Sequence, residues 1–420
     1  MLVVSRTGAI GRIAPAALAA ALLASPASVE GLLERQSSQS RPAATSAPDF
    51  TTLSARADAA RESGRLNDAV PLYRKALAIL PTWKEGWWSL GTILYEEDAH
   101  KEAAQAFQRL VSLDPKNGTA HLMLALCEYQ LDADDRALAN IQIAKKLGVQ
   151  ADSGLPNILT YHEGMLLLRA GRYERALDTL KPLASAGVED ENLEFAIGMG
   201  VLLVRPNDAP ARDSSTGAIV RRAGRAERHH MAKEFAAAKR EYVALVQQAG
   251  TLLNVHYAYG RFLLATEDLE SGIQEFLKEI EAHPDHVRAR VQIAAARYRL
   301  DSAAGLPFAH DVVKLAPDYP FGHYLLGLLY FDTGDIAQAI PELETAAKML
   351  PNEAQFHFAL GNAYARAGRA DEAARARAAF TRLKKNESSE TEGETLKRLD
   401  LDSASRPSAK NPPAKTPIRN

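Results

Sequence analysis

The sequence predicts an all-α fold, a right-handed α-solenoid of stacked helix-turn-helix hairpins. Three observations predict it: prolines recur at a near-constant interval, small residues recur at the same interval, and apolar residues follow helical spacing. Two-helix units of this length cannot bury their apolar faces alone and therefore stack on one another. The chain has 420 residues, of which 46% are hydrophobic, so it has enough apolar material for such a stack.

Prolines set the period of the repeat. Pro81 and Pro115 lie 34 residues apart, Pro317 and Pro351 are separated by the same interval, and Pro284 comes 33 residues before Pro317. Each follows the end of an apolar helical pattern, and a residue without a backbone donor cannot continue that helix. The prolines therefore mark where one unit ends and the chain turns into the next.

Small residues occupy equivalent places in each unit and allow two helices to cross closely. Counted from the start of the first helix, the eighth position holds Gly91, Ala125, Gly164, Gly260, Ala294, Gly327 and Gly361. The twentieth position holds Ala69, Ala103, Ala137, Ala176, Gly272, Ala339 and Ala373. Between the two helices, where a positive φ costs glycine least, the sequence has Gly64, Gly171, Gly334 and Gly368.

These residues resemble the tetratricopeptide repeat, a helix-turn-helix unit with small residues at its eighth and twentieth positions and a proline near its thirty-second. The resemblance implies a solenoid of about nine units over residues 49–385. It weakens over residues 191–250, where Pro206, Asp208 and Pro210 interrupt the pattern. There we expect a helix from Asn192 to Val204, a surface loop over residues 205–215, and a degenerate unit.

The two ends of the chain differ in composition from the repeats. Residues 1–27 combine Arg6 and Arg12 with a following apolar stretch and small residues around Pro26, which predicts a secretory signal peptide. Because that stretch is shorter than the roughly 20 residues of a membrane-spanning helix, we expect no stable membrane insertion after cleavage. The expected location is periplasmic or secreted. Residues 28–48 and 386–420 have the composition of a disordered linker and a solvated, disordered tail.

Composition and motifs argue against several functional classes. Lys and Arg total 50 against 52 Asp and Glu, so no overall field would attract nucleic acid. The one cysteine, Cys127, lies among leucines and is interpreted as a small buried residue. The sequence has no glycine-rich phosphate loop, zinc-protease motif or nucleophile elbow, so we expect no catalytic residues, no metal and no cofactor.

Two polar clusters in the sequence contain residue types that bind metals. His230 and Glu234 are four residues apart, beside His229 and Glu227, and on one helix face they could hold a metal weakly. Without further ligands at compatible spacing, a solvated helix face is the simpler interpretation. An acidic cluster lacks the glycine and distal glutamate of a calcium loop and predicts an inter-helix turn at Asp132, Asp134 and Asp135.

The resemblance also implies a binding surface. In this family the first helices line the concave side of a superhelix, where peptide ligands commonly lie, and here aromatic residues dominate the fifth and twelfth positions. Aromatic side chains are frequent at interfaces, although a stripe at helical spacing also packs neighbouring units. The candidate partner-binding residues are Trp88, Tyr95, Tyr129, Tyr257, Arg261, Tyr298, Tyr324, Phe331, Phe358 and Asn362.

Three functional hypotheses follow. The first is a non-catalytic scaffold that binds a protein or peptide partner in the exported compartment, with Arg261 and Arg366 as the nearest cations for an acidic peptide. Only Asn362 fits the Lys and Asn pattern with which family members capture a C-terminal carboxylate, so that mode is not expected. The second is an accessory subunit of an envelope polysaccharide or secretion machine. A hydrolase in residues 191–250 is disfavoured because the segment is too short for a catalytic core. Self-association is left open.

Overall fold

The computed structural model describes residues 49–151, 154–188 and 190–389. The expected signal peptide, linker and most of the expected tail therefore lie outside the described residues. The described chain is helical, which confirms the predicted all-α fold. It divides into two compact units, one of residues 1–171, 175–196 and 205–208, the other of residues 172–174, 197–204 and 209–420. Each unit is described by itself.

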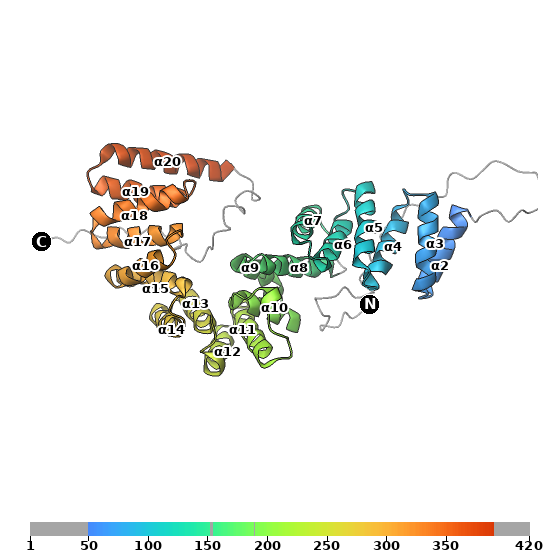
Figure 1. The fold of residues 1–420 in the computed structure, drawn as a ribbon, viewed down its shortest axis with the longest axis horizontal. Helices are drawn as coiled ribbons and strands as arrows, with labels where there is room; N and C mark the ends of the chain where they lie inside the picture. The colour runs from blue at the N-terminus through green and yellow to red at the C-terminus, as the bar shows by residue number, and fades with distance from the viewer. Residues whose placement is uncertain (1–48, 152–153, 189, 390–420) are drawn as a thin grey trace, which may run out of the picture. The chain divides into compact units, whose positions relative to one another are not determined.

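The described residues of unit 1 form four helical hairpins, in each of which a first helix packs along a second helix (Figure 1). Helix α9 begins in unit 2 and continues in unit 1. A short 3-10 helix, η2 (Pro206–Asp208), also belongs to unit 1. The hairpins are α2 (Phe50–Glu62) with α3 (Leu66–Ile79), α4 (Lys84–Glu96) with α5 (His100–Leu113), α6 (Gly118–Gln130) with α7 (Asp134–Leu147), and α8 (Leu155–Arg169) with α9 (Tyr173–Ser185).

In unit 2, the residues that the structure describes form the end of an unpaired helix, α10 (Glu191–Val201), and five hairpins. The strongest helix-to-helix packing is again within each hairpin and then between a second helix and the following first helix. The hairpins are α11 (Ser215–Met231) with α12 (Phe235–Ala249), α13 (Val255–Ala265) with α14 (Leu269–Ala282), α15 (Val287–Leu300) with α16 (Ser302–Leu315), α17 (Pro320–Thr333) with α18 (Ile336–Met349), and α19 (Ala354–Arg366) with α20 (Ala370–Ser389).

Most first helices end in a residue with left-handed backbone conformation. Gly64, Gly171, Gly334 and Gly368 have φ of 71°, 71°, 90° and 74°, as their placement between helices predicts. At the Gly64 turn, Arg65 N donates to Ala60 O and Gly64 N donates to Arg61 O, the two bonds of a Schellman motif. The same conformation occurs without glycine at Asp98, Asp132, Lys233 and Glu267.

The prolines predicted to end each unit do follow the second helices. At Pro81, Pro115, Pro317 and Pro351, the carbonyl oxygen lies within hydrogen-bond distance of a side chain six residues later, on the next first helix. This bond ties the turn between two hairpins to the helix that follows it. Trp87 Nε1 donates to Pro81 O at 2.8 Å, and the Nε2 atoms of His121, His323 and His357 lie 3.3, 2.9 and 2.8 Å from Pro115 O, Pro317 O and Pro351 O.

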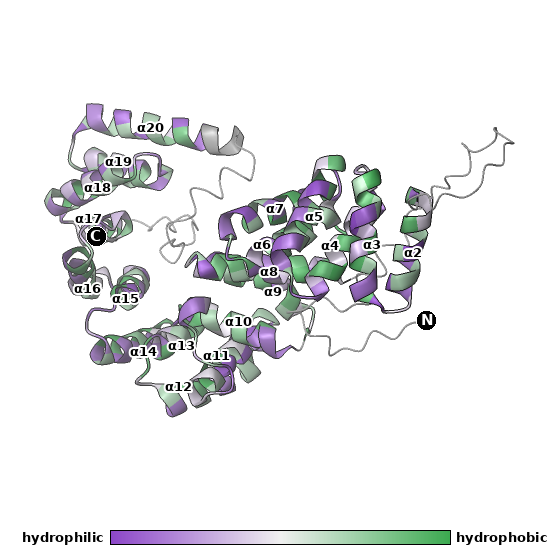
Figure 2. Ribbon diagram, turned by 45° about the vertical axis from the view of Figure 1, so that its right-hand side comes forward, coloured by the Kyte–Doolittle hydropathy of each residue, from purple (hydrophilic) through white to green (hydrophobic). Residues whose placement is uncertain are grey.

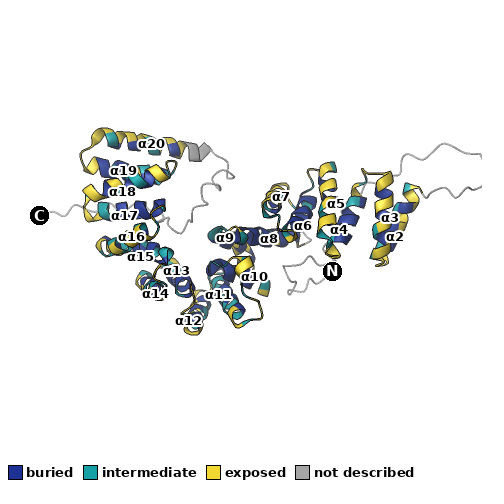
Figure 3. Ribbon diagram, viewed as in Figure 1, coloured by how far each residue is buried: buried dark blue, intermediate teal, exposed yellow. Residues whose placement is uncertain are grey.

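Small residues lie at the helix crossings, as predicted. A Cβ added at Gly91 would lie 2.9 Å from Cζ of Phe107, and one at Gly327 would lie 2.6 Å from Cγ of Leu343. Alanines at the twentieth position, such as Ala103, are fully buried. The first helices α6, α8 and α17 are consequently buried over most of their length (Figure 3).

The region predicted to be degenerate is more regular than the sequence suggests. Helix α10 ends at Val201 rather than Val204, and α11 with α12 forms a complete hairpin whose eighth and twentieth positions are Ala226 and Ala238. Within unit 2, α10 approaches α11 closely: a Cβ at Gly198 would lie 1.9 Å from Val220 O. The region therefore departs from the repeat pattern only at the unpaired helix α10 and at the segment between α10 and α11.

Helix α20 runs to Ser389, four residues beyond the predicted boundary at residue 385. The residues after Leu383 are polar, so the apolar periodicity used to predict helices gives no reason to extend this helix over them. Hydrophilic residues run along α20 (Figure 2). No helix among the described residues has the length and apolar character needed to span a bilayer.

Candidate binding surface on the first helices

The aromatic residues at the fifth position are buried. Trp88 on α4 is 7% exposed and meets Phe107 edge to face at 5.8 Å. Tyr257 on α13 is completely buried, and Tyr324 on α17 is 9% exposed. Sequence reasoning expects these three side chains on the binding surface, and the structure corrects this: they lie inside and have little area for a partner.

Residues of the following hairpin cover two of these aromatic rings. The ring of Tyr324 stacks on Phe356 of α19 at 4.7 Å, and the ring of Tyr257 lies 5.1 Å from that of His286, the residue before α15. The fifth position is thus a packing site between hairpins. A period read from one sequence cannot separate this role from ligand contact, because both need an apolar side chain at the same spacing.

The aromatic residues at the twelfth position are half-buried and contact the next first helix. In unit 1 the guanidinium of Arg169 on α8 lies 3.9 Å from the ring centroid of Tyr129 on α6. In unit 2 the guanidinium of Arg366 on α19 lies 5.7 Å from the ring of Phe331 on α17. Cation–π contacts of this kind are worth about 0.5–2 kcal/mol. They join the C-terminal ends of neighbouring first helices.

In unit 1 the twelfth-position residues are held in place. Arg169 pairs with Asp134 at 2.8 Å and Asp132 at 3.1 Å, which confirms that the acidic cluster forms an inter-helix turn. The other face of Tyr129 meets His162 edge-on at 5.1 Å. Tyr95, one hairpin earlier, is half-buried and lies 5.4 Å from the ring of His100. Both tyrosines are therefore packed residues with a partly exposed edge.

In unit 2 the twelfth-position residues leave a more open surface. Arg366 is exposed and makes no ion pair among the described residues, while Tyr298, Phe331 and Asn362 are half-buried. We call Tyr298, Phe331, Asn362 and Arg366 the aromatic–arginine surface. It draws on three consecutive first helices, α15, α17 and α19. Phe358, also predicted, is 51% exposed and belongs to a different face, described below.

Arg261, the other predicted cation, is already paired inside unit 2. Its guanidinium donates to Glu174 at 2.7 Å. Nearby, Glu227 accepts from Tyr242 Oη at 2.6 Å and lies 3.1 Å from His230 Nδ1. Burial favours the neutral acid, but the hydrogen bonds with His230 and Tyr242 and the charge of Arg261 hold the pKa of Glu227 below its usual value. The network stabilises unit 2 and leaves Arg261 little capacity for an acidic peptide.

The histidine cluster considered as a weak metal site has a different arrangement. Helix α11 ends at Met231, so His230 and Glu234 do not share a helix face. Glu234 instead lies 2.5 Å from Nδ1 of His229, and the ring of His230 packs edge-on against Phe262 at 5.3 Å. Among the residues that the structure describes, no three His, Cys, Asp or Glu side chains group as metal ligands.

Cys127 is completely buried in α6. Burial raises the pKa of its thiol to about 12, so the reactive thiolate is not populated near neutral pH. The residue packs as a small apolar side chain, as its sequence context predicts.

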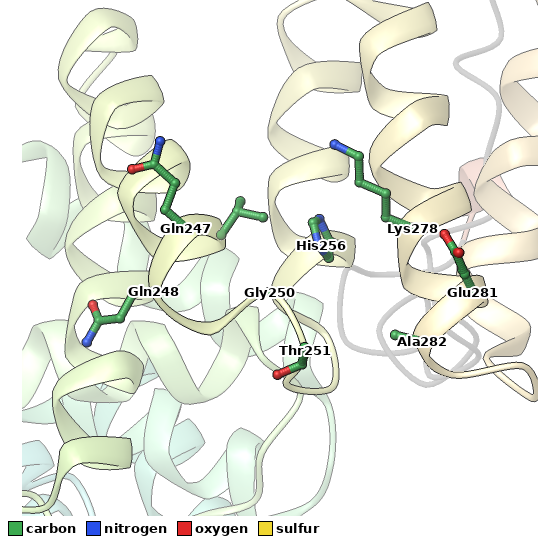
Figure 4. A pocket seen from close by; sticks show the side chains of 9 residues that line it. Gln247, Gln248, Gly250, Thr251, His256, Lys278, Glu281 and Ala282 are labelled. Carbon is green, nitrogen blue, oxygen red and sulfur yellow. The ribbon is translucent and has the colours of Figure 1, made fainter.

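One open pocket of about 470 Å³ lies between the end of α12 and the α13–α14 hairpin (Figure 4). Gln247 and Gln248 line one side, and His256, Lys278 and Glu281 line the other. His256 Nδ1 lies 2.6 Å from Glu275, which also accepts from Lys278 at 2.7 Å. Since His256 and Lys278 are already paired with Glu275, we assign the pocket no ligand.

Comparison with known proteins identifies the repeats. A family model described as tetratricopeptide repeat matches residues 54–118, 90–153 and 324–385. These segments of the chain are tetratricopeptide repeats. Two of the matched segments lie in unit 1 and the third covers α17 to α20, which contains most of the aromatic–arginine surface.

Solved structures that match this chain include several titled MamA. The MamA RS-1 ArsTM double mutant has 22% sequence identity and a TM-score of 0.38, over 39% of this chain and 93% of the other. MamA 41-end from Desulfovibrio magneticus RS-1 has 23% identity and a TM-score of 0.35, over 39% and 92%. No curated protein matches the chain. Tetratricopeptide repeats generally mediate binding to protein partners, and scaffolds built from them are generally not enzymes.

Proposed function

We propose that this chain is a non-catalytic scaffold that binds a protein or peptide partner in the exported compartment. The observation that supports it most is the aromatic–arginine surface of unit 2. It combines half-buried aromatic rings with an exposed guanidinium, side chains that are enriched among the strongest contributors to protein interfaces. It lies on helices whose packing fixes their positions, so binding would order few side chains.

The partner in this proposal contacts the C-terminal ends of the first helices in unit 2. Phe331 and Arg366 form the centre of the contact, because they already touch each other and one of them is exposed. Tyr298 and Asn362 extend it to either side. A carboxylate on the partner would find in Arg366 a guanidinium without an ion pair among the described residues.

The test is affinity capture from extracts of the source cells, with the wild-type chain and with a Phe331→Ala/Arg366→Ala variant as baits. Removing both central contacts should weaken binding by about 2 kcal/mol or more, or roughly 30-fold, so the partner should be lost. A matched control is Phe235→Ala, which removes an exposed phenylalanine, 48% exposed, from α12 of the same unit.

The result that supports the proposal is one protein recovered by the wild-type and Phe235→Ala chains and absent with the double variant. Thermal unfolding should show that the double variant is folded before capture is compared. Equal recovery by all three chains would place the partner elsewhere, and recovery of carbohydrate without protein would contradict the scaffold role.

We propose in addition that residues 1–27 direct export. The support is the arrangement of Arg6, Arg12 and the apolar stretch that follows, an arrangement typical of a secretory signal. Expression in a Gram-negative host with a C-terminal tag, followed by cell fractionation, tests it. The full chain should appear in the periplasmic fraction with a shortened N-terminus, and a chain lacking residues 1–27 should stay in the cytoplasm. Identical distribution of both would refute export.

A further inference from the structure

The last described hairpin, α19 with α20, has an uncovered face. Phe358 occupies the fifth position of α19 and is 51% exposed. In every earlier hairpin except the first, the residue at this position is buried to at least nine-tenths. Those residues are Trp88, Leu122, Tyr161, Ala223, Tyr257, Val291 and Tyr324.

Two residues of α20 are likewise more exposed than the equivalent residues of the other second helices. Arg377 is exposed, although its equivalents in the other second helices are fully buried, for example Tyr73, Phe107 and Leu343. Phe380 is half-buried and lies 5.2 Å from the ring of Phe358, although its equivalents are buried. We call Phe358, Arg377 and Phe380 the terminal face. Within unit 2, the α13–α14 and α17–α18 hairpins cover the equivalent surface with the hairpin that follows.

Earlier hairpins show what covers such a face. The ring of Phe356, at the third position of α19, stacks on Tyr324. The terminal face therefore has the shape to receive a helical segment that offers apolar side chains in the same way. An exposed phenylalanine in contact with a half-buried one, beside cations, is unusual on a surface that nothing covers.

The N-terminal hairpin of a second copy is a poor occupant. The third position of α2, equivalent to Phe356, is Thr52, and the neighbouring exposed residues Ala55, Arg56 and Ala59 bring no large apolar group. Stacking α2 on the terminal face through these positions would bring no large apolar side chain to Phe358 and Phe380. Head-to-tail association through this face is therefore disfavoured.

The chain itself carries a suitable segment shortly after α20. Residues 390–420 contain one group of large apolar residues, Leu396, Leu399 and Leu401, and Leu396 and Leu399 are spaced to share one side of a helix. Residues 390–394, which include Gly393, separate this group from α20. That length is typical of the connection between antiparallel helices.

Charge favours the same occupant. Arg377 and Arg382 are exposed on α20 and make no ion pair among the described residues. The segment after α20 is mainly acidic, with Lys397 and Arg398 against Glu390, Glu392, Glu394, Asp400 and Asp402. Opposite charges would therefore meet around the apolar contact.

We propose that residues 395–401 dock on the terminal face, with the leucines against Phe358 and Phe380 and the acidic residues near Arg377 and Arg382. The segment closes the stack, so that the apolar end of unit 2 is not presented to other molecules. This proposal is independent of the scaffold function, because Phe331 and Arg366 do not belong to the terminal face.

Hydrogen–deuterium exchange on the full-length chain tests the proposal. A Leu396→Ser/Leu399→Ser/Leu401→Ser variant should lose the docked segment, and amides of α19 and α20 should exchange about tenfold faster or more. Phe358→Ser should cause the same increase, and because this side chain is exposed in the hairpin, the substitution should leave the hairpin folded. Combining the three leucine substitutions with Phe358→Ser should not raise the exchange rates further, because both sets of substitutions remove the same contact. The matched control is Ile418→Ser, which removes an apolar residue elsewhere in the tail and should change no rate.

Three results would overturn the assignment. One is unchanged exchange in the triple-serine variant. Another is an increase with Phe358→Ser alone, which would mean that a different segment covers the face. The third is protection of α19 and α20 that grows with protein concentration in the wild-type chain, which would make a second copy the occupant.

Discussion

At the scale of single residues, the hairpins depend on a few backbone positions. The turn after a first helix needs a left-handed residue, and glycine supplies it at four turns while Asp98, Asp132, Lys233 and Glu267 supply it at four others. A residue with a Cβ pays roughly 1–2 kcal/mol for this conformation. The turn geometry is thus imposed by the packing of the two helices even where the local sequence opposes it.

Lys233→Gly should stabilise unit 2 by about 0.5–1 kcal/mol. The substitution relieves the strain at φ 64°, and the greater freedom of glycine in the unfolded chain offsets part of the gain. Thermal or urea unfolding measures the change. Lys239→Gly, at an exposed site within α12, is the control and should destabilise by about 1 kcal/mol. A loss of stability in Lys233→Gly would contradict the turn assignment.

Glu227→Gln should reduce stability by about 1–3 kcal/mol at pH 7 and by less at pH 3. The pKa of Glu227 is lower in the folded chain than its ordinary value of 4.5, so its ionised form stabilises above about pH 4.5 and this contribution is lost as pH falls further. Urea unfolding at both pH values measures the difference. Glu270→Gln, at an exposed ion pair with Arg297, should change stability by less than about 1 kcal/mol at either pH. An equal loss at pH 7 and pH 3 in Glu227→Gln would argue against the ionised network.

At the scale of secondary-structure elements, consecutive hairpins are joined by a bond that sequence reasoning missed. The side chain six residues after Pro81, Pro115, Pro317 and Pro351 reaches back to the proline carbonyl, and in α17 the ring of His323 also lies 2.6 Å from Glu342 of α18. One imidazole thereby connects the proline turn before α17 with α17 and α18. A signal was available, because histidine recurs six residues after Pro115, Pro317 and Pro351.

His323→Gln should cost about 1–3 kcal/mol, since the side chain at this buried position accounts for two hydrogen bonds, one of them with the carboxylate of Glu342, and one amide cannot reach both acceptors. Urea unfolding followed by tyrosine fluorescence or circular dichroism gives the value. His310→Gln changes an exposed histidine that contacts Tyr330 Oη in the same region, and it should alter stability by about 0.5 kcal/mol or less. Equal losses of stability in both variants would contradict a particular contribution of the bond between His323 and the proline carbonyl.

At the scale of the whole molecule, stability is carried by contacts between neighbours. Within each unit, consecutive hairpins pack on one another, so stability is expected to be a sum of local and nearest-neighbour terms. Damage should therefore spread outward from its origin and should not unfold the chain at once.

Gly91→Leu should show this spread. The added side chain would collide with Phe107 and cost about 1–3 kcal/mol or more. Hydrogen exchange should rise first in α4 and α5, then in α2, α3, α6 and α7, while α17 to α20 keep wild-type rates. A uniform rise over all described helices would mean that the chain unfolds as one cooperative block.

Much of the binding surface could not be read from the sequence. The fifth and twelfth positions both carry aromatic residues. Tyr324, at the fifth position, is covered by Phe356, whereas Phe331, at the twelfth, lies beside the exposed guanidinium of Arg366. Arg261 and Arg366 are both arginines on first helices, but Glu174 neutralises only the first. Exposure and pairing depend on which residues of distant hairpins arrive at the same place, and periodicity contains no such information.

The sequence alone determined that the chain forms paired helices, where most pairs begin and end, and which small residues let them cross. These features follow from local chemistry: helix periodicity, the missing donor of proline and the steric freedom of glycine. Only the tertiary structure decided that α10 stands unpaired among the described helices, that the aromatic stripe is mostly internal, and that no described hairpin covers Phe358. The reason is that burial is a property of the neighbour as much as of the residue, and a neighbour is defined only once the helices have packed.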